Sequence, residues 1–375
     1  MPLETLEFHT SLQKLLVSLI LILVPLTVFG FYVALQGDSH IRQMNGENFR
    51  ALTLTAAEST SEFIAGCVRD VSVIANTPEP TQAVTSANRQ YEHLSEEAVR
   101  AKITATEQNW ESSKTDGLSE QILTSNLARQ LRRIRELNPT LLKITVADVN
   151  GATVAATDRP VHYAQSDLEA WQALAASKPG AIHVSDLRYD DQHRLYYLSV
   201  AYPILQEGTG RFIGAVTAMA DVSSLFAQLN RRQMGRTGRL FLVREDGTVV
   251  EAPGVSPSMK MKSEEYGAIR DALGSLRGRE GGYLFATLAN GQSYLIGFAD
   301  TRLKEAYPNL PWIVLASQEA KELTGPVRSM TAFAVLVMVL ALLMLTLLAA
   351  YVFLHRKQEI DDIETPEDKT RPIAA

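Results

Sequence analysis

The chain has 375 residues, and its 36 Lys and Arg against 42 Asp and Glu give a net charge of -6. No stretch is dense in Lys and Arg, so the composition argues against a nucleic-acid partner. The single cysteine, Cys67, excludes an intramolecular disulfide and a cysteine-rich zinc site.

Two uncharged stretches are each long enough to cross a bilayer as a helix. They are residues 15–36 and residues 329–354, and a hydrocarbon core requires about 20 apolar residues in a helix. A cleaved secretory signal is the alternative for the first stretch. The acids Glu4 and Glu7 and the length of the apolar run favour an uncleaved anchor.

The charges beside the second stretch predict the topology. A basic triplet follows it at 355–357, whereas Arg328 alone precedes it. Because positive residues favour the cytoplasmic side, we expect residues 1–14 and the tail 355–375 in the cytoplasm and residues 37–328 outside. The tail is too short to contain a catalytic signalling domain.

Residues 38–75 carry apolar side chains at helical spacing, which predicts one long stalk helix of about 55 Å. The Pro-Glu-Pro sequence at 78–80 ends it. Cys67 lies on the apolar stripe and is interpreted as a small buried side chain. The stripe consists of Ile41, Met44, Phe49, Leu52, Ala56, Phe63, Cys67, Val71 and Ile74.

After further helices over 81–138, two β-rich segments follow in tandem. Residues 142–149 lead to Asn150-Gly151, and 96 residues later the pattern recurs at Asp246-Gly247. An Asn-Gly or Asp-Gly pair between two such runs is a strong hairpin signal. Each hairpin is followed by an insert and further strands, at 194–203, 211–222, 282–288, 293–299 and 312–317.

The predicted fold class is therefore α+β. It combines a long N-terminal stalk helix with two tandem antiparallel-sheet modules, flanked by two transmembrane helices. The order of these segments resembles the double Cache sensory domains of bacteria, whose modules are PAS-like. The resemblance covers residues 37–328. Its most specific part is 155–222, which contains YAQSDLEAWQ, RYDD, VAYPI and GRFIGAVTAMADV.

The resemblance implies a membrane-distal module at about 77–222 and a membrane-proximal module at about 236–318, outside the inner membrane of the cell. It also implies a ligand pocket in the distal module. The pocket is bounded by the segment from Tyr163 to Trp171, by the strand near Asp190 and by an acid matching Asp221. The candidate ligand-binding residues are Tyr163, Asp167, Trp171, Arg188, Asp190 and Asp221.

Family members that bind amino acids carry an arginine shortly before the tryptophan, and that position is not filled here. Arg188 is nearby in sequence but off the pattern. We therefore expect an amine, a betaine-like cation or a neutral solute rather than a carboxylate. Asp190 and Asp221 would hold the ammonium group, and Trp171 would supply a cation–π face.

Each candidate also has a structural interpretation. Asp167 and Asp221 can cap helices, and Tyr163 and Trp171 can fill the core. His162, His183 and His193 lie near acids but lack metal-ligand spacing, so we expect no metal and no cofactor. No nucleophile, zinc-protease or phosphate-binding motif is present, so we expect no enzyme activity.

The sequence thus predicts a membrane-anchored extracytoplasmic sensor that binds a small molecule and passes a shift to a separate signalling protein. The resemblance implies that the free edge of the stalk helix, including Cys67 or a neighbour, meets a second copy in a homodimer. One alternative is the sensor half of a histidine kinase or chemoreceptor that lacks its output domain. A structural envelope protein without a ligand is another, and an ectoenzyme ranks last.

Overall fold

The computed structural model describes residues 12–112, 117–176, 181–191, 193–231, 234–253, 260–275, 281–323, 333, 335–348 and 350. The chain divides into one unit of residues 46–319 and another of residues 1–45 and 320–375. Both sheets belong to residues 46–319. The predicted tail 355–375 and most of the segment 1–14 lie outside the described residues.

The first predicted membrane span lies within helix α1 (Leu12–Ala75), and part of the second lies outside the described residues. Across the described ranges, no helix combines the length and hydropathy needed to cross a membrane.

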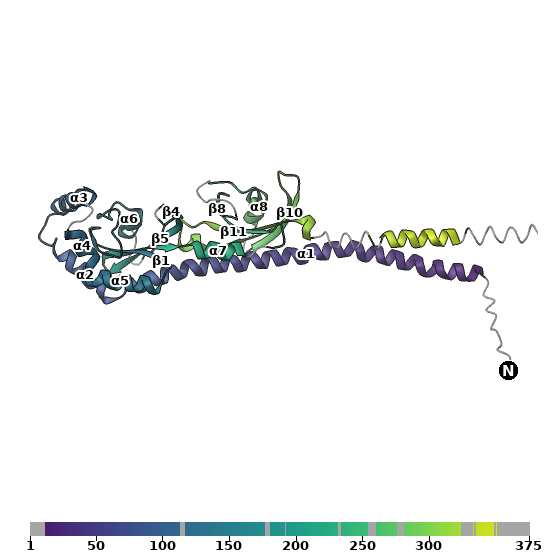
Figure 1. The fold of residues 1–375 in the computed structure, drawn as a ribbon, viewed down its shortest axis with the longest axis horizontal. Helices are drawn as coiled ribbons and strands as arrows, with labels where there is room; N and C mark the ends of the chain where they lie inside the picture. Colours follow the sequence, from purple (N-terminus) through teal and green to yellow (C-terminus); the bar gives the residue numbers. More distant parts are fainter. Residues whose placement is uncertain are drawn as a thin grey trace, which may run out of the picture. The chain divides into compact units, whose positions relative to one another are not determined.

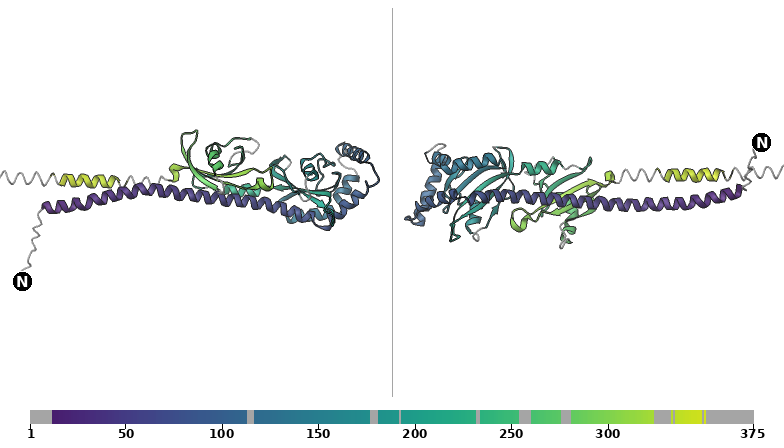
Figure 2. Two further views of the ribbon diagram at one scale, coloured as in Figure 1. Left: turned by 180° about the vertical axis from the view of Figure 1, so that it is seen from behind. Right: turned by 90° about the horizontal axis from the view of Figure 1, so that it is seen from below.

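The part of α1 from residue 46 onward runs along both sheets (Figures 1 and 2). Ser61 Oγ donates a hydrogen bond of 2.6 Å to the carbonyl oxygen of Thr301, and Asp70 accepts one of 2.6 Å from Asn138 Nδ2. The helix ends at Ala75, as the prolines predicted.

Cys67 is buried against the modules of its own chain, and burial raises the pKa of its thiol to about 12. Its interpretation as a small buried side chain is therefore confirmed. Cys67 therefore does not lie on a free edge of α1, which corrects that part of the predicted dimer contact.

The first module, residues 78–231, has an antiparallel sheet in the order β2-β1-β6-β5-β3, with β4 also paired to β5. Four helices precede the sheet: α2 (Pro78–Arg89), α3 (Glu96–Ser112), α4 (Gly117–Thr124) and α5 (Asn126–Leu137). Its strands are β1 (Leu141–Asp148), β2 (Thr153–Ala156), β3 (His183–Val184), β4 (Arg188–Asp190), β5 (Leu195–Leu205) and β6 (Phe212–Asp221). Two more helices are α6 (Glu169–Ala176) and α7 (Ser223–Arg231).

The second module, residues 239–319, has an antiparallel sheet in the order β8-β7-β11-β10-β9. Its strands are β7 (Arg239–Arg244), β8 (Val249–Glu251), β9 (Gly281–Thr287), β10 (Ser293–Asp300) and β11 (Trp312–Glu319). Its helices are α8 (Glu264–Ser275) and α9 (Leu303–Ala306). In Figure 1, α6 and α8 lie on the side of the sheets opposite to α1. The predicted α+β fold with two antiparallel sheets is confirmed.

The two modules begin with the same hairpin. The Gly151 N–H donates to the Asp148 carbonyl oxygen (3.0 Å), and the Gly247 N–H donates to the Arg244 carbonyl oxygen (2.8 Å). Both glycines have φ near +80°, at 79° and 81°, a conformation that glycine adopts without steric cost. Asp148 and Arg244 therefore occupy equivalent positions, each at the end of the first strand of its module.

Candidate functional site

The first module contains a cavity of about 1000 Å³. Its walls come from α3, from the segment between α2 and α3, from the turn after β1, from the segment before α6 and from the start of β6. Apolar and charged side chains both reach it. The lining includes Asn88, Tyr91, Glu92, Val99, Arg100, Ile103, Glu107, Asn150, Ala164, Asp167, Trp171, Arg211 and Phe212.

Hydrogen bonds connect helix α3 to the segment that follows β2. Trp110 Nε1 donates a hydrogen bond of 3.1 Å to the carbonyl oxygen of Pro160. Glu107 accepts a hydrogen bond of 2.6 Å from the Ala164 N–H, and its other carboxylate oxygen lies 3.0 Å from His162 Nδ1. These contacts fix one wall of the cavity relative to the sheet.

Trp171 forms another wall of the cavity. Its Nε1 donates to the carbonyl oxygen of Asp148 (3.4 Å), and its ring meets that of Phe212 edge to face, with 6.0 Å between centroids. Asp167 also lines the cavity and is exposed to solvent. Two of the six predicted residues, Asp167 and Trp171, thus border this cavity.

Tyr163 lies in the core beside the cavity. It is buried, and its ring packs against that of Trp110 with 5.9 Å between centroids. Burial raises the pKa of its hydroxyl, and the nearby Tyr91 hydroxyl adds to the effect. Tyr91 lines the cavity, whereas Tyr163 does not and lies behind it in the core.

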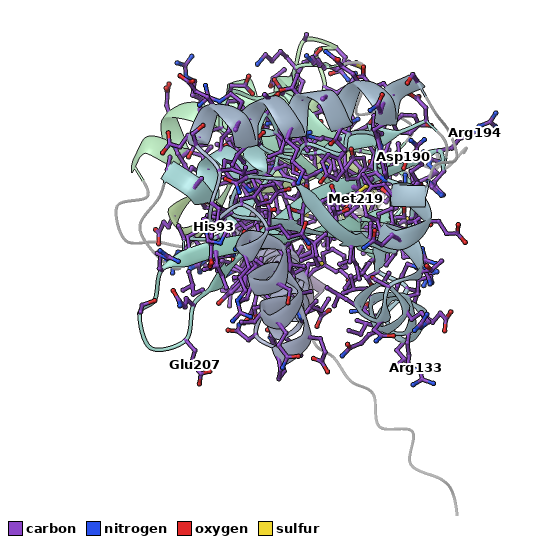
Figure 3. The ribbon with its side chains drawn as sticks, turned by 90° about the vertical axis from the view of Figure 1, so that its left-hand side faces the viewer. His93, Arg133, Asp190, Arg194, Glu207 and Met219 are labelled. Atoms are coloured by element: carbon purple, nitrogen blue, oxygen red, sulfur yellow. The ribbon has the colours of Figure 1, made fainter. Side chains whose placement is uncertain are left out.

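Three predicted residues lie elsewhere. Arg188 pairs with Glu169 at 3.2 Å and lines, with Trp171, a smaller pocket of about 50 Å³. Asp190 is buried and contacts Lys143 Nζ at 3.3 Å. Figure 3 shows Asp190 on the opposite side of the first module from His93, a neighbour of the cavity residue Tyr91.

Asp221 accepts a hydrogen bond of 2.8 Å from the Ser223 N–H, at the start of α7. The cavity borders the other end of β6, at Phe212. The six predicted residues therefore do not meet on one cavity, because β6 carries Asp221 a full strand length away. This geometry fits the helix-capping interpretation of Asp221.

The sequence reasoning missed Asp148. Its side chain is 1% exposed, and one carboxylate oxygen, Oδ2, has no hydrogen-bond partner among the described residues. Burial raises the pKa of this carboxyl to about 6, although backbone N–H groups in the turn oppose the shift. An alignment of the two hairpins could have drawn attention to it, because the acid Asp148 stands at the position that Arg244 occupies in the second hairpin.

The charged groups of the cavity are mostly acidic. Four carboxylates and two guanidinium groups line it: Glu92, Glu96, Glu107, Asp167, Arg100 and Arg211. At its border, Glu107, Glu111 and His162 each offer one possible metal-ligand atom within 4.8 Å of the others. Two of the three are already engaged with each other, since His162 Nδ1 contacts Glu107.

Comparison with known proteins places this geometry in a family. The family model described as "Cache domain" matches residues 39–327. Among curated proteins, none matches this chain in sequence.

Several solved structures resemble the chain. The ligand-binding domain of the Pseudomonas aeruginosa amino acid chemoreceptor PctC, in complex with GABA, is 16% identical. The match covers 73% of this chain and 100% of that one, with a TM-score of 0.47. The corresponding domain of the P. aeruginosa chemoreceptor PctB, in complex with L-Arg, is 16% identical over 75% of this chain and 97% of that one (TM-score 0.44). The domain of the Pseudomonas fluorescens chemoreceptor CtaA, in complex with L-isoleucine, is 14% identical over 78% and 97% (TM-score 0.44).

Proposed function

We propose a function from the premise that this chain belongs to the Cache domain family. Cache domains are ligand-binding sensor modules of membrane receptors. The chain would act as an extracytoplasmic sensor that binds a small molecule in its first module. The role is one of binding and signalling rather than catalysis.

The observation that carries the proposal is the cavity of about 1000 Å³ in the first module. Pockets for small molecules typically measure about 300–1000 Å³ and combine apolar walls with a few polar groups. Here Val99, Ile103 and Phe212 supply apolar surface, and Trp171 supplies an aromatic wall. The cavity therefore has the size and the lining of a metabolite site.

The charges of the lining favour a cation or a neutral solute. Its four carboxylates outnumber its two guanidinium groups, and the rings of Tyr91 and Trp171 offer faces that attract cations. No arginine stands shortly before Trp171. We therefore propose an amine or a neutral solute as the ligand class.

The proposal includes a membrane anchor at residues 15–36 and 329–354. Its support is the absence of charge from both stretches and the basic triplet after the second. Because α1 is one helix from Leu12 to Ala75, a shift of the first module would displace its helical stalk by about 1–2 Å. A separate signalling protein, or a second copy of the chain, would receive that shift.

A thermal screen of the full chain in detergent tests the binding function. A compound present at 100 times its Kd adds about 2.7 kcal/mol to the free energy of unfolding, which shifts the melting temperature by several degrees. We expect at least one metabolite, an amine or a neutral solute, to give such a shift.

Two matched variants on α3 locate the site. Thr104→Trp introduces a large side chain at the cavity lining, whereas Asn109→Trp does so at an exposed position that is not part of the lining. The stabilisation should disappear in Thr104→Trp and persist in Asn109→Trp. A screen without any stabilising compound, or equal stabilisation of both variants, would contradict the proposal.

A further inference from the structure

Asp148 is held in the turn after β1 by only one of its two carboxylate oxygens. Oδ1 accepts hydrogen bonds of 2.9 Å from the N–H groups of Asn150 and Ala152. Oδ2 is buried and, in the part of the chain that the structure describes, accepts no hydrogen bond. A buried charged oxygen without a partner is unfavourable, because it has lost its hydration and gained nothing in exchange.

The turn itself does not require a carboxylate. A single acceptor satisfies both N–H groups, and the side-chain amide of asparagine supplies one. The equivalent position in the second module is Arg244, and that hairpin has the same backbone hydrogen bonds. The second oxygen of Asp148 is therefore unexplained by the fold.

Asp148 does not itself line the cavity but is buried next to residues that do. Trp171, which lines the cavity, donates from Nε1 to the Asp148 carbonyl oxygen. The two residues after Asp148, Val149 and Asn150, also line the cavity. Burial raises the pKa of Tyr91, another lining residue, and the nearby charge of Asp148 adds to the effect, so the carboxylate and this residue are close.

We infer that Asp148 is the acid that receives the positively charged, N–H-donating group of the ligand. This inference rests on the proposed binding function and assigns it a chemical class: an organic amine, protonated and small enough for the cavity. An ammonium N–H would give Oδ2 its missing partner as a charge-assisted hydrogen bond. Tyr91 and Trp171 would flank the cation with their rings.

The inference makes amine binding depend on pH. Only the ionised carboxylate attracts a cation, and burial raises the pKa of Asp148 to about 6. Amine affinity should therefore be full at pH 8 and fall as the pH drops through 6. The titratable and charged groups around Asp148 and the cavity are Tyr91, Tyr163, Glu92, Glu96, Glu107, Asp167, Arg100 and Arg211.

The experiment uses the full chain in detergent and a defined set of probes. Ethylammonium, propylammonium and putrescine are compared with ethanol, propanol and butanediol by thermal unfolding and by calorimetry, at pH 8 and pH 5. We expect at least one amine to stabilise the parent at pH 8. The affinity for that amine should be at least tenfold lower at pH 5. The matching alcohol should have no effect.

Two substitutions separate the effect of Asp148 from that of the general charge of the first module. Asp148→Asn keeps an acceptor for the turn and should weaken amine binding at pH 8 by about 10-fold or more. Asp191→Asn removes the same charge from an exposed position of the first module that does not line the cavity, and it should change the affinity less than threefold, because water screens it. If Asp148→Asn fails to fold, the pH comparison of the parent still decides the matter.

The outcomes distinguish this inference from the proposed function. Equal amine binding by the parent and by Asp148→Asn overturns the assignment of Asp148. Stabilisation by neutral or anionic metabolites, with none by any amine, overturns the ligand class and leaves the binding function intact. Stabilisation by no compound at all overturns both.

Discussion

The two modules share a hairpin but differ in what covers it. In the first module Ala164 lies beside the turn, and a Cβ on Gly151 would lie 2.5 Å from the backbone N of Ser166. In the second module Lys262 occupies the position equivalent to Ala164, since each forms the matching isolated bridge. The same backbone thus carries a small side chain in one module and a long cationic one in the other.

The second hairpin is closed by its own side chains. Lys262 Nζ donates to Asp246 (2.7 Å) and to Thr248 Oγ1 (2.8 Å). The Tyr266 hydroxyl donates to the carbonyl oxygen of Glu245, and a Cβ on Gly247 would lie 2.6 Å from the Tyr266 ring. The second hairpin is therefore contacted by long side chains of its own module, whereas Val149 and Asn150 of the first hairpin line the cavity.

The charged residues at the ends of β1 and β7 also differ in whether they are paired. Arg244 pairs with Asp186, which lies between β3 and β4 of the first module. Asp148 has an ionisable oxygen without a hydrogen-bond partner among the described residues. One charge is paired within the protein, and the other is the one that we assign to the ligand.

The largest expected effect is on the stability of the unliganded chain. Burial raises the pKa of Asp148 to about 6 in the folded protein, from about 3.8 for an exposed aspartate, so the folded state binds the proton more tightly. Stability should then fall as the pH rises from about 4 to about 6, by roughly 3 kcal/mol in total. Asp148→Asn should remove this fall and be the more stable protein at pH 7.5.

Urea unfolding of the parent and of Asp148→Asn, measured from pH 4 to pH 8, checks this prediction. Asp158→Asn, in the same module but outside the turn, serves as the control. Parallel pH profiles for the parent and Asp148→Asn would show that the carboxylate is solvated or paired after all.

The next largest effect is expected when the first module is given a lysine at the position equivalent to Lys262. Ala164→Lys places a cationic side chain at the cavity lining, beside the turn, where the second module has Lys262. An internal ammonium would compete with the ligand for the acid, so we expect a loss of amine affinity of about 100-fold. Calorimetry at pH 8 measures it.

Ala164→Gln is the matched control, because it adds comparable bulk without the charge. A loss of affinity as large as that of Ala164→Lys would assign the effect to crowding instead of charge.

Much of the fold could be predicted from local signals. Asn150-Gly151 and Asp246-Gly247 mark hairpins through turn chemistry, and the prolines at 78 and 80 mark the end of α1. The site was harder to predict, because the cavity depends on where α3 packs. That helix has no motif, and contacts such as those of Glu107 with the segment after β2 join residues 55 or more apart.

A smaller effect on stability is expected for the ion pair between Arg244, at the end of β7, and Asp186. Arg244 and Asp186 are both partly exposed, and such pairs contribute about 0.5–1 kcal/mol. Arg244→Met should therefore lower the free energy of unfolding by that amount and leave amine affinity unchanged. A double-mutant cycle with Asp186→Asn measures the coupling, and a large change in affinity would mean that the second hairpin also controls the cavity.

The smallest effect is predicted for Asp221, the acid that the sequence placed in the pocket. Its carboxylate accepts the Ser223 N–H at the start of α7, and asparagine is an equally good acceptor at the start of a helix. Asp221→Asn should therefore change the free energy of unfolding by less than about 0.5 kcal/mol. It should leave amine affinity within twofold of the parent. The contrast with Asp148→Asn is the sharpest test of which acid serves the cavity, since both substitutions exchange one oxygen for nitrogen in the same module. If Asp221→Asn weakens binding more than Asp148→Asn does, the ligand lies beyond the cavity described here, at the α7 end of β6.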